Sequence, residues 1–361
     1  MTVAQANHKK TEAFLGENLI FIISQPRSGS TLLQRILAGH PSVLASAETW
    51  LMLHPLYGLR ANGLNAEYEA SWARTGITEF LDHYAKGSDT YDDGIRSFGN
   101  TIYTAALEQA GKTLFIDKTP RYYYVAKDLY RIFPKAKFIF LLRNPMAVLA
   151  SELDTYVNSN LPFLSEFADD LIKAPTSILE AIDQIGDDAI VIRYEEFAKA
   201  PEQSARKLCD QLGIEFFDGM LDYSKTPAPI GKMNDPVGIH RDTTTHQKSI
   251  DKWEALRDNP QHRHFALSYL DELGRQTMSD YGYSFDKIKA VLEKVEKGGL
   301  TAEILPWHVA ITPRVQWSSK QRLRYKQFVA AKGHPSSIRW IIHAWTTSRF
   351  ILTRLGRSFG V

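Results

Sequence analysis

Four short runs of consecutive apolar residues stand out along the chain, each bounded by polar or turn-forming residues. They are NLIFIIS at 18–24, TLFI at 113–116, KFIFLL at 137–142 and AIVI at 189–192. Strands that are apolar on both faces are typical of a parallel sheet covered by helices on both sides. The pattern therefore predicts four strands of a buried parallel sheet.

A helix start follows each predicted strand. After the first strand, apolar residues recur at the helical period and Gly39-His40-Pro41 predicts the helix end; they are Leu32, Leu33, Ile36 and Leu37. Proline stands at the expected first helical position in Thr119-Pro120, Asn144-Pro145 and Ala200-Pro201, and Thr119 and Asn144 are suitable caps. Strands alternating with helices predict an α/β fold with a doubly wound parallel sheet flanked by helices.

The remaining segments complete the predicted organisation. Residues 50–110 and 152–185 are expected to be mostly helical or irregular and to cover the carboxyl edge of the sheet, where ligands bind in such folds. The charged, glycine-containing stretch Lys294–Gly299 is the predicted boundary. It would separate an α/β domain at 1–295 from a basic, tryptophan-containing extension at 296–361.

The composition, 44% hydrophobic and 23% charged over 361 residues, excludes a wholly disordered chain. The single cysteine, Cys209, cannot form an internal disulfide, which favours a reducing compartment. No apolar run approaches the roughly 20 residues of a membrane-spanning helix, and Met1–Lys10 is polar. We therefore expect a cytoplasmic protein.

The net charge of +2 is unevenly distributed, because residues 301–361 carry ten Lys and Arg against one acid, Glu303. Ile338, Ile341, Ile342 and Trp345 recur there at helical spacing. A basic amphipathic helix of this kind can lie peripherally on the inner membrane surface or bind an acidic polymer. It can equally pack on the acidic body or form a homodimer contact. Both interpretations stay open.

The segment Ser24–Thr31, with the sequence SQPRSGST, links the first strand to its helix. Backbone N–H groups in such a loop, together with the helix dipole, bind phosphate-like oxygens. The nucleotide-triphosphate version reads G-x-x-x-x-G-K-[ST], whereas here Ser30 occupies the lysine position and Arg27 lies three residues earlier. This P-loop-type segment therefore suits a group of lower charge than a γ-phosphate with magnesium.

A second anion signature follows KFIFLL, where Arg143, Asn144 and Pro145 precede Ser151, which lies eight residues after the arginine. Together with Pro26–Thr31 it resembles the PAPS-dependent sulfotransferases, especially the branch of tyrosylprotein sulfotransferases and their bacterial relatives. The resemblance implies that the donor, 3′-phosphoadenosine 5′-phosphosulfate (PAPS), is bound at its 3′-phosphate by Arg143 and Ser151. Its 5′ end would be bound by Arg27, Ser28, Gly29, Ser30 and Thr31.

The resemblance extends to three further segments. It implies that Glu48, in Ala47-Glu48-Thr49, is the general base, that Lys118 stabilises the transferring group, and that Tyr194 approaches the nucleotide. Residues 40–48 can return the chain by up to about 30 Å, enough for Glu48 to reach the loop. The alternatives are a solvent-facing carboxylate, a helix-entry charge and a packed ring, respectively. His246, Lys248 and Lys252 are candidates for a loop that closes over the nucleotide.

The resemblance implies an enzyme that moves a sulfuryl group in line from PAPS to an acceptor hydroxyl. Glu48 would take the proton, and Arg27 and Lys118 would offset the developing charge without a metal. The acceptor would be a small molecule, lipid, sugar or phenol, and no nucleic-acid partner is expected. Two alternatives remain: a P-loop kinase or NTPase in which Asp117 binds magnesium, and a non-catalytic anion-binding module at a membrane surface.

Overall fold

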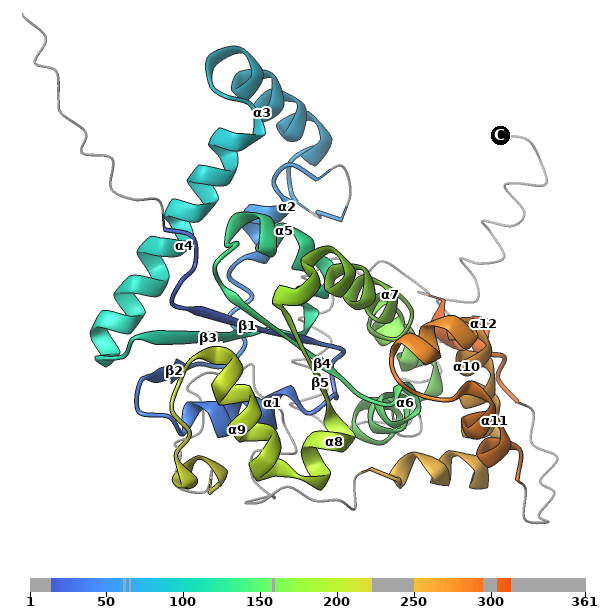
Figure 1. The fold of residues 1–361 in the computed structure, drawn as a ribbon. Coiled ribbons are helices and arrows are strands. Elements are labelled where there is room, and N and C mark those ends of the chain that lie inside the picture. Colours follow the sequence, from blue (N-terminus) through green and yellow to red (C-terminus); the bar gives the residue numbers. More distant parts are fainter. Residues whose placement is uncertain are drawn as a thin grey trace, which may run out of the picture.

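The computed structural model describes residues 14–60, 63–64, 66–157, 160–222, 250–294 and 304–312. Its centre is a parallel sheet of five strands in the order β2-β3-β1-β4-β5, with helices on both faces (Figure 1). The strands are β1 (Leu19–Ser24), β2 (Val43–Ala45), β3 (Leu114–Lys118), β4 (Lys137–Leu142) and β5 (Ala189–Arg193). The predicted doubly wound parallel sheet is confirmed.

The strand order fixes where the loops meet. β1 lies between β3 and β4, so the chain builds first one half of the sheet and then the other. The four predicted strands are all present within about two residues at either end. The sequence pattern does not single out β2, because three residues at a sheet edge are too short for a recognisable apolar run.

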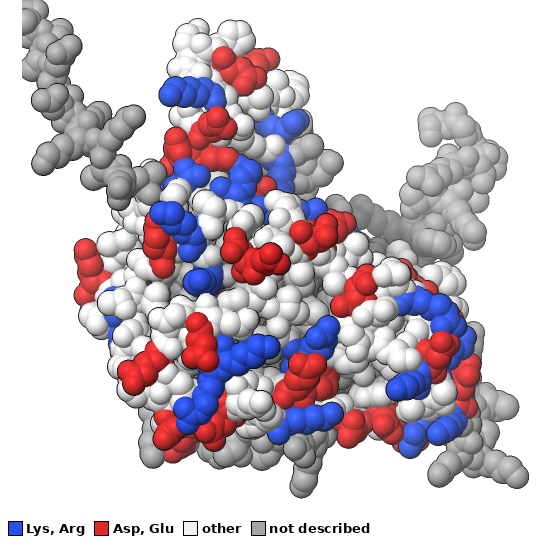
Figure 2. Space-filling view, viewed as in Figure 1, with Lys and Arg blue, Asp and Glu red and all other residues white. Residues whose placement is uncertain are grey.

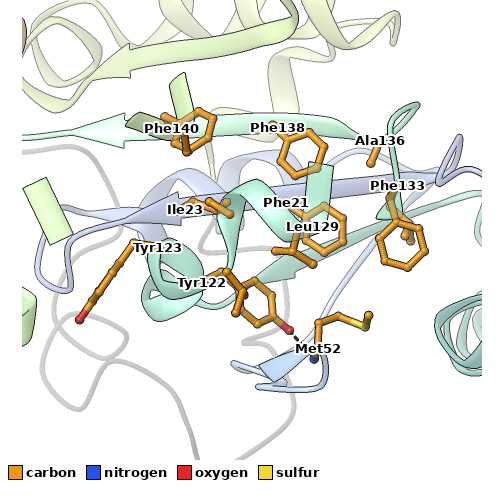
Figure 3. Close-up of a cluster of buried hydrophobic side chains, with 14 of the residues drawn as sticks. Phe21, Ile23, Met52, Tyr122, Tyr123, Leu129, Phe133, Ala136, Phe138 and Phe140 are labelled. Carbon is orange, nitrogen blue, oxygen red and sulfur yellow. Dashed lines mark hydrogen bonds between the residues drawn. The ribbon is translucent and has the colours of Figure 1, made fainter. Parts of the chain in front are cut away.

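The two faces of the sheet follow from the alternation of side chains along β1 and β4. Ile20, Ile22 and Ile139 point to one face, where they pack against α1 (Ser30–Ala38), α8 (Tyr194–Lys199) and α9 (Pro201–Leu212). Phe21 and Phe138 point to the other face. They pack against the 3-10 helix η1 (Pro120–Tyr124), α5 (Ala126–Ile132) and α7 (Ala168–Ile185) (Figure 3).

A third apolar cluster lies beside the sheet and is built from helices alone (Figure 1). It contains buried residues of α6 (Pro145–Glu152), η2 (Leu153–Val157), η3 (Leu161–Phe167), η7 (Lys252–Asp258), α10 (Pro260–Asp280), α11 (Phe285–Glu293) and α12 (Trp307–Ile311). Two further short 3-10 helices are η4 (Gly186–Asp188) and η5 (Asp218–Leu221). Because α6 is buried on nearly all sides, its residues are held firmly in place.

Only part of residues 50–110 covers the carboxyl edge of the sheet as the sequence predicted. The segment up to α2 (Leu53–Tyr57) lies at the carboxyl end of β3, since Trp50 N donates to Thr119 Oγ1 at 3.3 Å. The helices α3 (Ala70–Tyr84) and α4 (Ser88–Ala110) instead form an arm that projects from the body (Figure 1). The expectation that all of 50–110 covers the sheet edge is therefore wrong, because α4 packs by one face beside β3 and extends beyond it.

The C-terminal extension is described only at residues 304–312. There Trp307 and Ala310 are buried against the helical cluster that includes Phe265 and Tyr269. The division at 295/296 and the amphipathic helix near 338–355 lie outside the described residues, as do His246 and Lys248, and stay predictions. Across the described ranges, no helix is both long and apolar enough to cross a bilayer.

Replacing Phe138 tests the arrangement of the core. Its ring is fully buried and lies 5.3 Å from that of Phe21. We expect Phe138→Ala to lower the free energy of unfolding by about 3–5 kcal/mol in urea titrations, because it leaves a cavity between sheet and helices. The matched control is Phe98→Ala on α4, whose side chain is 41% exposed and whose loss should be small. If both variants lost the same free energy of unfolding, this arrangement of the core would be contradicted.

Candidate active site

The loop between β1 and α1 has the shape of an anion-binding turn. Arg27 and Gly29 both adopt positive φ angles, 68° and 92°, so the chain bends sharply before α1 begins. A Cβ added at Gly29 would lie 2.6 Å from the ring of Tyr194. Only glycine therefore fits where this loop passes over the start of α8.

The start of α1 leaves hydrogen-bonding groups for a ligand. Within the described residues, no side chain caps the N-terminus of this helix. The Ser28 hydroxyl is buried and, in the same part of the chain, has no hydrogen-bond partner. Because the first turn of a helix carries unpaired N–H groups and a partial positive charge, the loop fits a phosphate- or sulfate-like group.

Arg143 lies against this loop, as the two anion signatures required. Its Nη1 donates to the carbonyl oxygen of Arg27 at 2.7 Å, and its guanidinium lies 4.4 Å over the ring of Tyr194. Burial, and to a lesser degree the charge of Arg27, lower the pKa of Arg143. Two guanidinium groups held close together favour an anion beside them.

Ser151 joins the same cluster through Arg27. Asn144 caps α6 by accepting from Met146 N at 3.0 Å, as predicted, and Ser151 follows near the end of that helix. Its hydroxyl accepts a hydrogen bond from Arg27 Nε at 3.1 Å. The loop, Arg143 and Ser151 are thus brought together from three separate segments.

Two contacts of Arg27 were not foreseen from the sequence. Its Nη2 lies 3.4 Å from Thr155 Oγ1, and its guanidinium lies 5.5 Å from the ring of Tyr156. Both residues belong to η2, a π-helical turn that follows α6 directly. No sequence signal identifies them, because a π turn changes the helical register and so changes which side chains face the loop.

Glu48, which follows β2, and Lys118, at the end of β3, form a second group. The Lys118 side chain is fully buried, and its Nζ donates to Glu48 Oε1 at 3.1 Å and to Thr31 Oγ1 at 3.4 Å. The other Glu48 oxygen accepts from Trp50 Nε1 at 3.2 Å. Glu48 does return to the anion loop, and it is not simply a solvent-facing carboxylate.

A buried carboxylate holds the Glu48 segment in place. Asp117 accepts hydrogen bonds from four hydroxyl groups at 2.7–3.2 Å, those of Thr49, Tyr103, Thr119 and Tyr122. Burial raises its pKa, and these four donors oppose that rise. Thr119 therefore does not cap the following 3-10 helix, contrary to expectation, because its hydroxyl binds Asp117.

Asp117 also bears on the kinase alternative. A magnesium-binding aspartate must present its oxygens to the nucleotide, whereas those of Asp117 already bind Thr49, Tyr122 and their neighbours. In the part of the chain that the structure describes, no group of three or more His, Cys, Asp or Glu residues could hold a metal ion.

A further polar cluster lies beside Glu48 and was not identified from the sequence. Arg121 donates to Asp170 through Nε and Nη2 at 2.5–3.1 Å, and its guanidinium lies 5.6 Å from the ring of Trp50. Trp50 in turn donates to Glu48. Arg121 and Trp50 therefore form a wall next to the candidate base.

Glu152 is the most unusual group near the site. It is fully buried at the end of α6, and neither of its carboxyl oxygens has a hydrogen-bond partner within the described residues. Burial and the charge of Asp170 raise its pKa to about 8, although Arg27 and Arg121 oppose the rise. Glu152 is thus mostly protonated near neutral pH, which the sequence pattern around Ser151 does not reveal.

Comparison with known proteins identifies the family. Residues 19–218, more than half of the chain, match the family model described as the sulfotransferase family. The matched range includes the anion loop, Glu48, Lys118, Arg143, Ser151 and Tyr194. The chain therefore belongs to the sulfotransferase family, a family of transferase enzymes.

Individual relatives agree with this assignment. The chain is 31% identical over 222 residues to nodulation protein NoeE of Sinorhizobium fredii, covering 55% of this chain and 50% of that protein. It is 28% identical over 215 residues to protein-tyrosine sulfotransferase 1 of Danio rerio, covering 57% and 56%. The alignments thus span about half the length of these curated relatives.

A solved structure agrees with the fold. The sulfotransferase domain from the curacin biosynthetic pathway is similar with a TM-score of 0.52 at 24% sequence identity. The match covers 73% of this chain and 97% of that domain.

Glu152→Gln tests the buried carboxyl. A carboxyl whose pKa rises from 4.5 to about 8 on folding binds a proton more tightly in the folded state, so stability falls as pH rises through that window. We expect the variant to be more stable than the wild type by about 1–4 kcal/mol at pH 9. At pH 5 the two should be nearly equal in urea titrations.

The control for this comparison is Glu293→Gln, which changes an exposed carboxyl at the end of α11. If the free energy of unfolding depended on pH in the same way in the wild type and in Glu152→Gln, the buried, protonated state of Glu152 would be contradicted.

Proposed function

We propose that this protein transfers a sulfuryl group from PAPS to an acceptor hydroxyl. The observation that carries the proposal is the contact of Arg143 Nη1 with the carbonyl oxygen of Arg27, 2.7 Å away. It joins the anion loop after β1 to a cationic pocket after β4, and these strands are neighbours in the sheet. Two adjoining anion sites suit a donor with a phosphosulfate at one end and a phosphate at the other.

The donor would be held by groups that are already in place. The backbone and hydroxyls of Ser28–Thr31 would bind the 5′-phosphosulfate, as helix N-termini bind phosphate. Arg143 and Ser151 would bind the 3′-phosphate, and Arg27, which bonds to Ser151, would serve both ends. Tyr194 supports this pocket by packing against Gly29 and under Arg143.

The proposed reaction is an in-line displacement at sulfur. The acceptor oxygen forms a bond to sulfur while the bond from sulfur to the bridging oxygen of the 5′-phosphate breaks, and that oxygen keeps the electron pair. The products are the sulfated acceptor and adenosine 3′,5′-bisphosphate. As in phosphoryl transfer, positioning and charge stabilisation supply most of the catalysis.

Glu48 is the proposed general base and Lys118 the proposed stabiliser of the leaving oxygen. Glu48 is held by Lys118 and Trp50, so its carboxylate has a fixed orientation near the loop. Lys118 Nζ lies between Glu48 and the Thr31 hydroxyl, so one ammonium group can act on both the base and the 5′ end of the donor. A positioned cation of this kind offsets charge as it develops.

Trp50 and Arg121 lie beside Glu48, and the acceptor is proposed to contact them. An indole ring with a guanidinium 5.6 Å away favours a flat or ring-shaped group through stacking and cation–π contacts. Phenols and sugars therefore fit this wall better than a linear alcohol or a lipid tail.

Glu48→Gln tests the base. The amide keeps the size of the side chain but cannot accept the acceptor proton, so we expect turnover with PAPS and a phenolic acceptor to fall by about 10² or more. Affinity for adenosine 3′,5′-bisphosphate should change little in calorimetry. Glu180→Gln, at an exposed glutamate paired with Lys127, is the control. Unchanged turnover in Glu48→Gln would remove Glu48 from this role.

Arg143→Ala tests the second anion pocket. We expect it to weaken binding of adenosine 3′,5′-bisphosphate by about 10-fold or more, because a buried charge-assisted hydrogen bond is lost. Affinity for adenosine 5′-monophosphate, which lacks the 3′-phosphate, should fall by a smaller factor, because only the support of the anion loop is lost. Arg206→Ala, at an exposed arginine paired with Glu202, provides the control. Wild-type affinity for the bisphosphate would refute the assignment.

A further inference from the structure

The projecting arm exposes an aromatic face that the sulfotransferase site does not use. In α3, Leu81 is the only buried residue, whereas Trp72 and Tyr84 are 79% and 81% exposed. Tyr68, just before the helix, and Phe80 are each 60% exposed. Large exposed apolar patches on soluble proteins generally mark interaction sites.

Three of these aromatic residues, Trp72, Phe80 and Tyr84, form a stripe on α3 in which Gly76 lies midway between Trp72 and Phe80. Trp72, Gly76, Phe80 and Tyr84 follow one another at intervals of four, which places them along one ridge of the helix. Tyr68 precedes the extended N-cap residue Glu69, so it lies beyond the helical part of the stripe. A Cβ added at Gly76 would meet nothing within 4 Å, so the centre of the stripe is open space.

We propose that α3 pairs with α3 of a second copy of this chain, antiparallel, with the two-fold axis passing at Gly76. In that pairing Trp72 of each copy lies opposite Phe80 of the other. Gly76 meets Gly76 at the crossing, where the absence of side chains lets the helix backbones approach closely. The interface is therefore isologous, as in most soluble homodimers.

The charge around the stripe is mixed, as on a surface that binds another protein. The helix α3 carries both basic and acidic residues, Arg74 and His83 as well as Glu79 and Asp82. Figure 2 shows acidic and basic side chains interspersed around the arm. A surface of mixed charge lacks the cluster of Lys and Arg that attracts proteins to an anionic lipid surface.

The size of the stripe predicts a dimer of moderate affinity. Four aromatic side chains exposed to this degree present about 500 Å² per copy, since each has about 150–250 Å² in all. Two copies then bury about 1,000 Å², at the low end for specific interfaces. We therefore expect dissociation in the micromolar range.

Sedimentation velocity at protein concentrations of about 1–200 µM tests the proposal. This range brackets the micromolar dissociation constant expected for an interface of that size. We expect a concentration-dependent monomer–dimer equilibrium in the wild type, and a monomer throughout in Phe80→Glu. Thr78→Glu is the matched control, because Thr78 is exposed on the same helix but about 160° round from Phe80. Circular dichroism of both variants checks that the fold is retained.

A cysteine at the axis gives an independent test. The only native cysteine, Cys209, is buried, so the background is clean. Gly76→Cys should form a covalent dimer on mild oxidation, because residues on a two-fold axis approach their own copies, whereas Thr78→Cys should not. The proposal is overturned if the wild-type protein is monomeric throughout the concentration range. That holds also if the monomer instead binds lipid vesicles through Trp72. A dimer that survives Phe80→Glu, or equal cross-linking at 76 and 78, overturns it as well.

Discussion

The hydrogen bond from Arg143 to the carbonyl oxygen of Arg27 is the contact on which the candidate site depends. It crosses from the end of β4 to the loop after β1 and holds that loop where Arg27 has a positive φ. Tyr194 completes the arrangement, since its ring packs against Gly29 and lies under Arg143. A loop braced in this way presents its backbone N–H groups without needing a ligand to order them.

Glu48, the proposed base, is held by a different set of contacts. Asp117 is buried at the end of β3 and bonded by hydroxyls from the Glu48 segment, from α4 and from η1. A buried carboxylate is costly unless its hydrogen bonds are satisfied, so these donors must all be in place together. The position of Glu48 is therefore coupled to the packing of the whole β3 side of the sheet.

Much of this site was accessible from the sequence, because the decisive residues sit at fixed distances from strand ends. Arg143 follows β4 directly, and Arg27 to Thr31 link β1 to α1, so parallel pairing of the two strands was enough to bring them together. The sequence could not identify three other residues near the site, Thr155, Tyr156 and Arg121. Their contacts depend on a π turn and on packing between segments far apart in the chain.

The apolar runs by themselves determined the parallel sheet, since only strands buried on both faces tolerate such composition, and the spacing of Arg143 and Ser151 determined the second anion signature. Tertiary structure alone decided that Arg27 turns to Ser151, that Asp117 accepts four hydroxyls, and that Glu152 is buried without a partner. It also decided that α3 stands clear of the body. Local sequence sets strand and helix propensity, whereas burial and hydrogen-bond partners arise only when distant segments pack together.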